Sequence, residues 1–108
     1  MNVIVHVVEA TATGTLSMVC ASANLLADAG LQVHVVYSPR PETPARLVDM
    51  FRGSVTLHAI PMSGIAAIPA ISQLRRLLLS IRPDVIHLHS SFAGFLGRIS
   101  AFALPISA

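Results

Sequence analysis

Short apolar runs alternate with helical patterns along this chain, and this alternation restricts the fold more than any other feature. The four runs are Val3–Val8, 31–37, 54–59 and Val85–Leu88. The last of them is apolar and β-branched, as expected for a parallel strand covered on both faces. Strands that alternate with helices are joined by right-handed crossovers, so the sequence predicts an α/β fold with a Rossmann-like parallel sheet.

Helical segments with recognisable ends separate these runs. Gly14 and Thr15 open the first helix, and Gly30 follows its last turn at the position where glycine commonly ends a helix. A short helix is predicted over 45–52 and another over 93–103. The longest helical pattern has an apolar stripe of Ile68, Ile71, Leu74, Leu77, Leu78 and Ile81.

Pro83 fixes the point where this longest helix must end. Proline cannot continue a helix, and it pushes the residue before it, Arg82, out of the helical region. A strand therefore starts directly after it. In that strand His87 and His89 face one side, because side chains alternate, and Ile86 faces the other.

The doubly wound order 3-2-1-4 makes the first and fourth strands neighbours. The loop 9–14 then lies beside the loop 89–94, although the two are far apart in the sequence. Ligands of open α/β sheets bind at such a point, beyond the carboxyl ends of the strands. Polar side chains that follow the fourth strand, His89, Ser90 and Ser91, would line this crevice.

The crevice lacks the residues that several common kinds of binding site require. A dinucleotide site needs closely spaced glycines after the first strand, and only Gly14 is present there. A P-loop is excluded because the chain contains no lysine. The seven basic residues are scattered arginines, a weak pattern for nucleic-acid binding. No cofactor is expected.

The five histidines allow one metal-site alternative. His87 and His89 stand two apart on a strand and could ligate a metal, but no carboxylate or third ligand accompanies them. We therefore predict no metal site, and a core position for His87 hydrogen-bonded to the backbone. His6 and His34 are interpreted as structural, and the sequence leaves the role of His58 open.

The amino-acid composition indicates whether the chain needs a partner and in which cellular compartment it is expected. The 108 residues are 54% hydrophobic and 11% charged, so some apolar surface is expected to need a partner or a further segment to cover it. Cys20, the only cysteine, is predicted to be a buried inert thiol, which fits a reducing compartment. The amino terminus enters a strand without a basic leader, so a cytoplasmic location is expected.

Three segments of the sequence resemble a known family. They are Val5-His6-Val7-Val8-Glu9-Ala10 with Gly14-Thr15, then residues 33–44, and then Asp84-Val85-Ile86-His87-Leu88-His89-Ser90-Ser91 with residues 93–98. These segments are similar to the first, second and fourth strands, with the loops that follow them, of the acceptor-side domain in family 4 retaining glycosyltransferases. The similarity runs over nearly the whole chain.

The resemblance implies the fold, the substrates and the site. It implies that residues 1–108 are the incomplete N-terminal domain of a two-domain GT-B enzyme. Such an enzyme moves a hexosyl unit from a nucleotide sugar to a glycan or lipid-linked acceptor. The implied setting is polysaccharide or cell-envelope synthesis. Gly14 and Thr15 match the loop that approaches the donor, and the substrate-binding set adds His89, Ser90 and Ser91. The family's active-site histidine is expected beyond Ala108, and the nucleotide-sugar domain beyond that, so this chain alone is expected to be inactive.

Three alternatives remain open at this stage. The chain could be a non-catalytic subunit that docks a separate nucleotide-sugar domain, or a hydrolase whose metal is held by His87 and His89. Arginines 75, 76 and 82 could touch the inner face of a membrane, although three arginines are few and an ordinary solvated helix face is preferred.

Overall fold

A computed structural model describes residues 2–8, 13–39, 46–62 and 66–88 of the chain. Within these residues the elements are β1 (Val3–Val8), α1 (Thr13–Asp28), β2 (Gln32–Tyr37), the 3₁₀ helix η1 (Leu47–Met50), β3 (Thr56–Ala59), α2 (Ala67–Ile81) and β4 (Val85–Leu88). The predicted helix over 93–103 lies outside the described residues.

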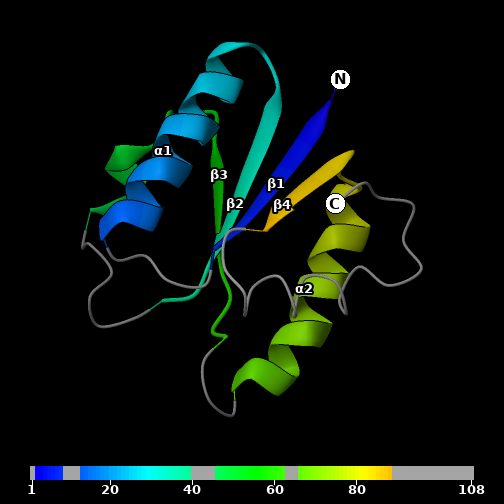
Figure 1. Cartoon of the computed structure of the whole chain (residues 1–108). Helices are drawn as coiled ribbons and strands as arrows, with labels where there is room; N and C mark the ends of the chain where they lie inside the picture. The colour runs from blue at the N-terminus through cyan, green and yellow to red at the C-terminus, as the bar shows by residue number, and fades with distance from the viewer. Residues whose placement is uncertain (1, 9–12, 40–45, 63–65, 89–108) are drawn as a thin grey trace.

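The four strands form one parallel sheet in the order β3-β2-β1-β4 (Figure 1), which confirms the predicted fold class and strand order. β1 lies in the middle of the sheet, paired with β2 from Val3↔Gln32 to Val8↔Tyr37 and with β4 from Ile4↔Val85 to Val7↔Leu88. β1 and β2 are valine-rich because both of their faces are buried.

Helices cover the two faces of the sheet. On one face α1 and η1 pack over Val8, Val33 and Val35, with Val19 and Leu47 among the buried residues between the layers. On the other face α2 packs over Val5, Val7, Val36 and Ile86. Figure 1 shows α1 and α2 on opposite sides of the sheet. Apolar residues of α2 at helical spacing, Ala70, Leu74 and Leu78, are almost completely buried there.

Residues in the left-handed region end both α-helices. Gly30, with φ +92, follows α1, and this positive φ is accessible to glycine at little cost. Arg82 caps α2 at φ 55 and ψ 61. The prediction that Pro83 pushes Arg82 out of the helical region is therefore confirmed, although Arg82 goes to the left-handed region, where a non-glycine residue is uncommon.

The helix predicted over 45–52 is largely wrong. Within the described residues of this range only the 3₁₀ helix Leu47–Met50 is present. Phe51 leaves the helix with φ −115 and ψ 155, and its side chain is buried in that extended conformation. Burial of Phe51 thus requires the backbone to leave the helix, and the segment ends after one turn.

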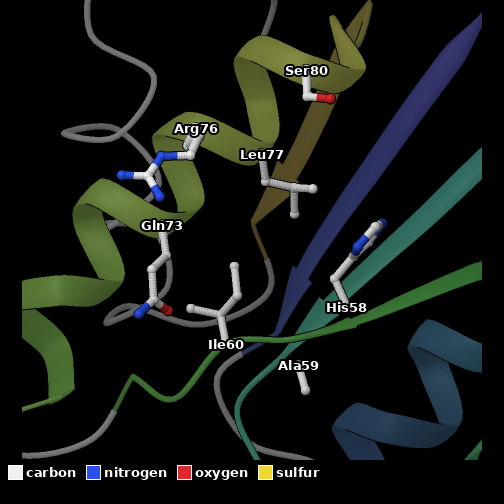
Figure 2. A pocket seen from close by; sticks show the side chains of 7 residues that line it. All are labelled: His58, Ala59, Ile60, Gln73, Arg76, Leu77 and Ser80. Carbon is white, nitrogen blue, oxygen red and sulfur yellow. The ribbon is translucent and has the colours of Figure 1, made fainter.

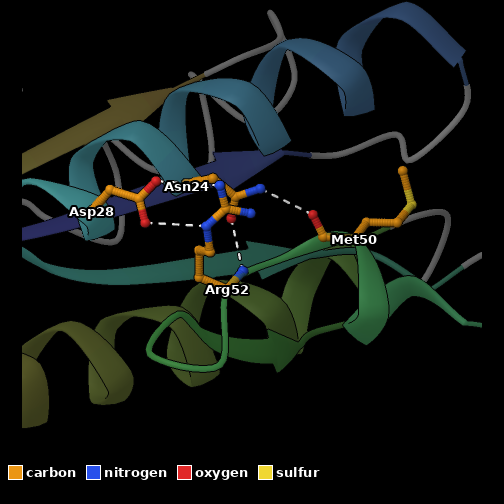
Figure 3. Close-up of polar contacts among 4 residues, drawn as sticks. All are labelled: Asn24, Asp28, Met50 and Arg52. Atoms are coloured by element: carbon orange, nitrogen blue, oxygen red, sulfur yellow. Dashed lines mark hydrogen bonds and ion pairs between the residues drawn. The ribbon is translucent and has the colours of Figure 1, made fainter.

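Asn24 joins α1 to the end of η1 through two hydrogen bonds to the backbone (Figure 3). Its amide nitrogen donates to the carbonyl oxygen of Met50 over 3.0 Å, and its amide oxygen accepts from the backbone N–H of Arg52 over 2.8 Å. The Arg52 guanidinium also contacts both carboxylate oxygens of Asp28, at 3.1 and 3.2 Å. The two Asn24 hydrogen bonds satisfy backbone groups that the short 3₁₀ turn leaves without helical partners.

Candidate functional site

β1 and β4 are adjacent and parallel, so their carboxyl ends meet at the same edge of the sheet. Val7, one residue before the end of β1, lies in register with Leu88, the last residue of β4. The segments that follow these strands therefore start side by side. This is the reversal point of strand order, where open α/β sheets bind their ligands, and we call it the β1/β4 edge.

Two of the five predicted substrate-binding residues fall within the described part of the chain. Gly14 and Thr15 lie in the first turn of α1, the helix that follows β1. The first backbone N–H groups of a helix have no partner within it, so they are suited to bind an anion. His89, Ser90 and Ser91 lie outside the described residues, as do the loop residues 9–12. The catalytic histidine that the family resemblance implies beyond Ala108 stays a prediction.

Ser38 supports the same edge of the sheet at the end of β2, and the sequence analysis did not identify it. Its side chain is completely buried, and its hydroxyl oxygen accepts a hydrogen bond of 3.0 Å from the backbone N–H of Met62. The Ile60 N–H donates to the carbonyl oxygen of Tyr37 over 2.9 Å. The chain leaving β3 is thus attached to the end of β2. A serine just after a strand was the only available signal.

His6 and His87 lie side by side on the face of the sheet that carries α1. The two residues are in register, and their ring centroids are 5.4 Å apart with a 38° tilt. His6 is fully buried, as expected of a structural histidine. His87 is exposed, so its predicted core position is wrong. The reason is that, among the described residues, α1 packs mainly on β2 and β1 and does not cover β4.

A second pair of histidines connects β2 to β3 on the opposite face. His34 Nδ1 and His58 Nε2 are 2.9 Å apart, and the rings stack with centroids 5.2 Å apart. The side-chain nitrogen of Gln32 lies 3.1 Å from His34 Nε2. Burial lowers the pKa of both imidazoles, and the charge of His58 lowers the pKa of His34 further. Both rings are therefore held neutral at pH 7.

The Cys20 thiol is buried against the sheet, so its predicted burial is confirmed. Burial also raises the pKa of this thiol, which disfavours the reactive thiolate. Among residues 2–8, 13–39, 46–62 and 66–88 there is no group of three or more histidine, cysteine, aspartate or glutamate side chains that could hold a metal ion. The pair of His87 with His89 stays untested because His89 lies outside these residues.

The parallel sheet in the order β3-β2-β1-β4, with helices on both faces, defines a Rossmann-like α/β protein. A family model described as Glycosyltransferase Family 4 matches residues 13–107. The chain belongs to this glycosyltransferase family, as the resemblance of its strands and loops implied. No curated protein gives a match to the chain.

Family membership gives the chain a glycosyltransferase-type role, with a sugar donor and an acceptor as its general substrates. The parallel sheet in the order 3-2-1-4 is consistent with part of a GT-B domain. Neither of the two described α-helices is long and apolar enough to cross a bilayer.

Proposed function

We propose that the chain is the acceptor-side, N-terminal part of a GT-B glycosyltransferase that transfers a hexosyl unit from a nucleotide sugar to a glycan or lipid-linked acceptor. The observation that carries the proposal is the parallel pairing of β1 with β4. Because of this pairing, the segment that leads from β1 to Gly14 and the segment that leads from β4 to His89 begin at the same edge of the sheet. The family match over residues 13–107 supports the same reading.

In this proposal the chain supplies one wall of the cleft. Backbone N–H groups of the first turn of α1, at Gly14 and Thr15, approach the diphosphate of the donor, because a helix amino terminus favours negative charge. His89, Ser90 and Ser91 contact the acceptor. Stabilisation of the leaving diphosphate requires further groups on a second, nucleotide-sugar-binding domain. Polysaccharide or cell-envelope synthesis in the cytoplasm is the proposed setting.

A direct test is to titrate the 108-residue chain with nucleotide sugars by calorimetry, alone and together with a separately expressed nucleotide-sugar domain of a family member. We expect no turnover by the chain alone and no binding tighter than about millimolar, because a single wall of the cleft gives few contacts. Turnover by the isolated chain would contradict the proposal that it is incomplete.

The loop after β1 can be tested separately in an active two-domain protein that contains this region. Gly14→Val places a branched side chain where the backbone approaches the diphosphate, and we expect the KM for the donor to rise by about tenfold or more. Gly53→Ala is the matched control, because Gly53 lies between η1 and β3 and belongs to neither of the segments that follow β1 and β4. An unchanged KM for Gly14→Val would remove Gly14 from the site.

A non-catalytic docking subunit is a second candidate, and a specific observation favours it. Large apolar side chains are exposed on both α-helices: Met18 and Leu25 on α1 are 63% and 70% exposed, and Ile68 on α2 is 76% exposed. Met18 and Leu25 are two turns apart on α1, so they lie on the same side of that helix, and neighbouring exposed apolar side chains can mark an interface. Co-purification of a stable complex with a nucleotide-sugar domain, without any transferase activity, would support this candidate over the first.

Contact with the inner face of a membrane is proposed only as an accessory property. Arg76 on α2 and Arg82, the residue that caps this helix, are exposed, and α2 also exposes Ile68 and Leu79. Basic and apolar side chains on one helix are the combination that binds anionic lipid surfaces. Sedimentation with vesicles tests this: binding to vesicles with anionic lipid, lost in high salt and absent with zwitterionic lipid, is the expected result.

A further inference from the structure

A groove of about 430 Å³ opens between β3 and α2, on the face of the sheet opposite α1 (Figure 2). We call it the β3/α2 groove. It is lined by His58, Ala59, Ile60, Gln73, Arg76, Leu77 and Ser80. β2 and β1 separate β3 from β4, so the groove is distinct from the β1/β4 edge. Its volume is in the range that holds a small organic molecule.

The helix side of the groove combines polar and apolar groups. Gln73, Arg76, Leu77 and Ser80 are spaced i, i+3, i+4 and i+7, so they lie on one side of α2. Leu77 is half-buried and Ile60, opposite it, is 7% exposed, which gives an apolar floor. The exposed Arg76 makes no ion pair or hydrogen bond with any residue that the structure describes.

The strand side of the groove carries a hydrogen-bond donor whose position follows from the neighbouring contacts. An amide nitrogen can only donate, so the nitrogen of Gln32 makes His34 Nε2 the acceptor. The proton of neutral His34 is then on Nδ1 and is donated to His58 Nε2. Neutral His58 must therefore carry its own proton on Nδ1. Within the described residues this N–H has no partner.

Figure 2 shows how these groups are distributed along the groove. Arg76 and Gln73 lie at one end, His58 lies at the other, and Leu77 and Ile60 lie between them. A ligand that satisfies all three parts has a negative charge at one end, an apolar middle and a hydrogen-bond acceptor at the other end. A guanidinium pairs well with the oxygens of a carboxylate or a phosphate.

We propose that the β3/α2 groove binds a small organic anion, a carboxylate or a phosphate monoester, between Arg76 and the Nδ1–H of His58 with its apolar part on Leu77 and Ile60. The proposal does not depend on the proposed transferase function, because it uses no residue of the β1/β4 edge. Burial lowers the pKa of His58, which keeps the donor neutral and its proton on one nitrogen at pH 7.

The test is a titration of the ¹⁵N-labelled 108-residue chain, followed by amide and histidine-ring shifts. The probe is 4-nitrophenyl phosphate, which has a charged end, an apolar ring and a nitro acceptor, and 4-nitrobenzyl alcohol is its uncharged counterpart. We expect saturable shifts at His58, Ile60 and Leu77, and at least about tenfold weaker binding of the alcohol, since a charge-assisted hydrogen bond is worth about a factor of ten.

Three variants make the titration specific. Arg76→Gln removes the charge from an exposed position and is expected to weaken phosphate binding about tenfold or more. His58→Phe keeps a ring and removes the donor, with a loss of several-fold or more. Arg82→Gln removes an exposed arginine that does not line the groove and is expected to change affinity less than twofold. If His58→Phe fails to fold, as judged by its amide spectrum, Arg76→Gln carries the test.

Several results would overturn the proposal. They are the absence of saturable shifts up to about 10 mM probe, equal affinity for the charged and uncharged probes, or an unchanged affinity in Arg76→Gln. A lipid phosphate is distinguished by a parallel arm with vesicles containing phosphatidate. Binding to these vesicles without any binding of 4-nitrophenyl phosphate would assign Arg76 to a membrane surface instead.

Discussion

At the scale of single residues, the histidine pair between β2 and β3 shows how a polar group is accommodated in an apolar sheet. His34 is 8% exposed, so its ring nitrogens need partners, and it finds them in Gln32 and His58. This arrangement requires both rings to be neutral, because a proton on both nitrogens of His34 would direct one N–H at the Gln32 amide nitrogen, itself a donor. Protonation and folding are therefore linked.

The linkage predicts that stability falls as the pH is lowered. The pKa of His34 and of His58 is lowered in the folded state, so below about pH 6.5 the unfolded chain binds protons more readily than the folded one. The free energy of unfolding should be constant above about pH 7. As the pH is lowered from there, it should decrease until the pH is below the folded-state pKa values of His34 and His58. Urea unfolding between pH 5 and 8 measures this.

The variant His34→Gln should flatten this pH dependence, because it removes one of the two titrating rings. A slope in His34→Gln equal to that of the unaltered chain would contradict the assignment of the pH dependence to this pair.

Two glycines with open space around them give a second test at this scale. A Cβ added at Gly30 or at Gly53 would meet no atom within 4 Å, so only the backbone distinguishes them. Gly30 has φ +92, whereas Gly53 lies outside the left-handed region. Gly30→Ala should destabilise by about 1 kcal/mol or more, and Gly53→Ala should be neutral or stabilise by up to about 1 kcal/mol. Thermal unfolding of both variants decides this, and equal shifts would contradict it.

At the scale of elements, η1 depends on contacts from α1 more than on its own hydrogen bonds. It is a single 3₁₀ turn in which only Leu47 is buried. Asn24 and Asp28, one turn apart on α1, hold the segment between η1 and Arg52 (Figure 3). The position of η1 over the sheet is therefore set by side chains of another element.

Asn24 is expected to contribute more than Asp28, although Asp28 carries the charge. Asn24→Ala leaves the Met50 carbonyl and the Arg52 N–H without their partner, at a cost of about 1–2 kcal/mol for two hydrogen bonds. Asp28→Ala removes an ion pair between side chains that are more than half exposed, at a cost of about 0.2–1 kcal/mol. Urea unfolding of the two variants compares them, and a larger loss for Asp28→Ala would be the contrary result.

At the scale of the whole molecule, the strands differ in how many neighbours secure them. β1 and β2 each pair on both sides, whereas β3 pairs only with β2 among the described residues and is four residues long. β1 is further secured at its start, where the Val3 N–H donates to an Asp84 carboxylate oxygen over 2.7 Å and the Asp84 N–H donates to the Val3 carbonyl oxygen over 2.8 Å.

Amide hydrogen exchange should follow this ranking. The slowest exchange is expected for the central residues of β1 and β2, such as Val5, Val7 and Val35, because they exchange only when the sheet opens globally. Amides of β3 should exchange faster through local opening. The comparison needs no variant, and protection of β3 equal to that of β1 would show that another segment covers or pairs with its free edge.

The fold was more predictable from the sequence than the site. The positions of the strands and of the two longer helices follow from local patterns, and their alternation predicts right-handed crossovers to a parallel sheet. The order 3-2-1-4 is one of the common doubly wound orders, and the structure confirms it. The contacts of Ser38, and of His34 with His58, join residues 24 apart, and they depend on a register between β2 and β3 that no local pattern shows. The exposure of His87 depends on which strands α1 covers. The features that the sequence did not predict therefore depend on contacts between residues far apart in the chain.

The central position of β1 also has a consequence for biosynthesis. This strand is made first, but its second neighbour starts only at Val85. A ribosome that adds roughly 5–20 residues per second needs roughly 4–16 s to reach that point. During this interval the valine-rich β1 has one unpaired edge, and its apolar side chains are not fully buried. A chaperone that engages the nascent chain before β4 emerges would find its binding site in Val3–Val8.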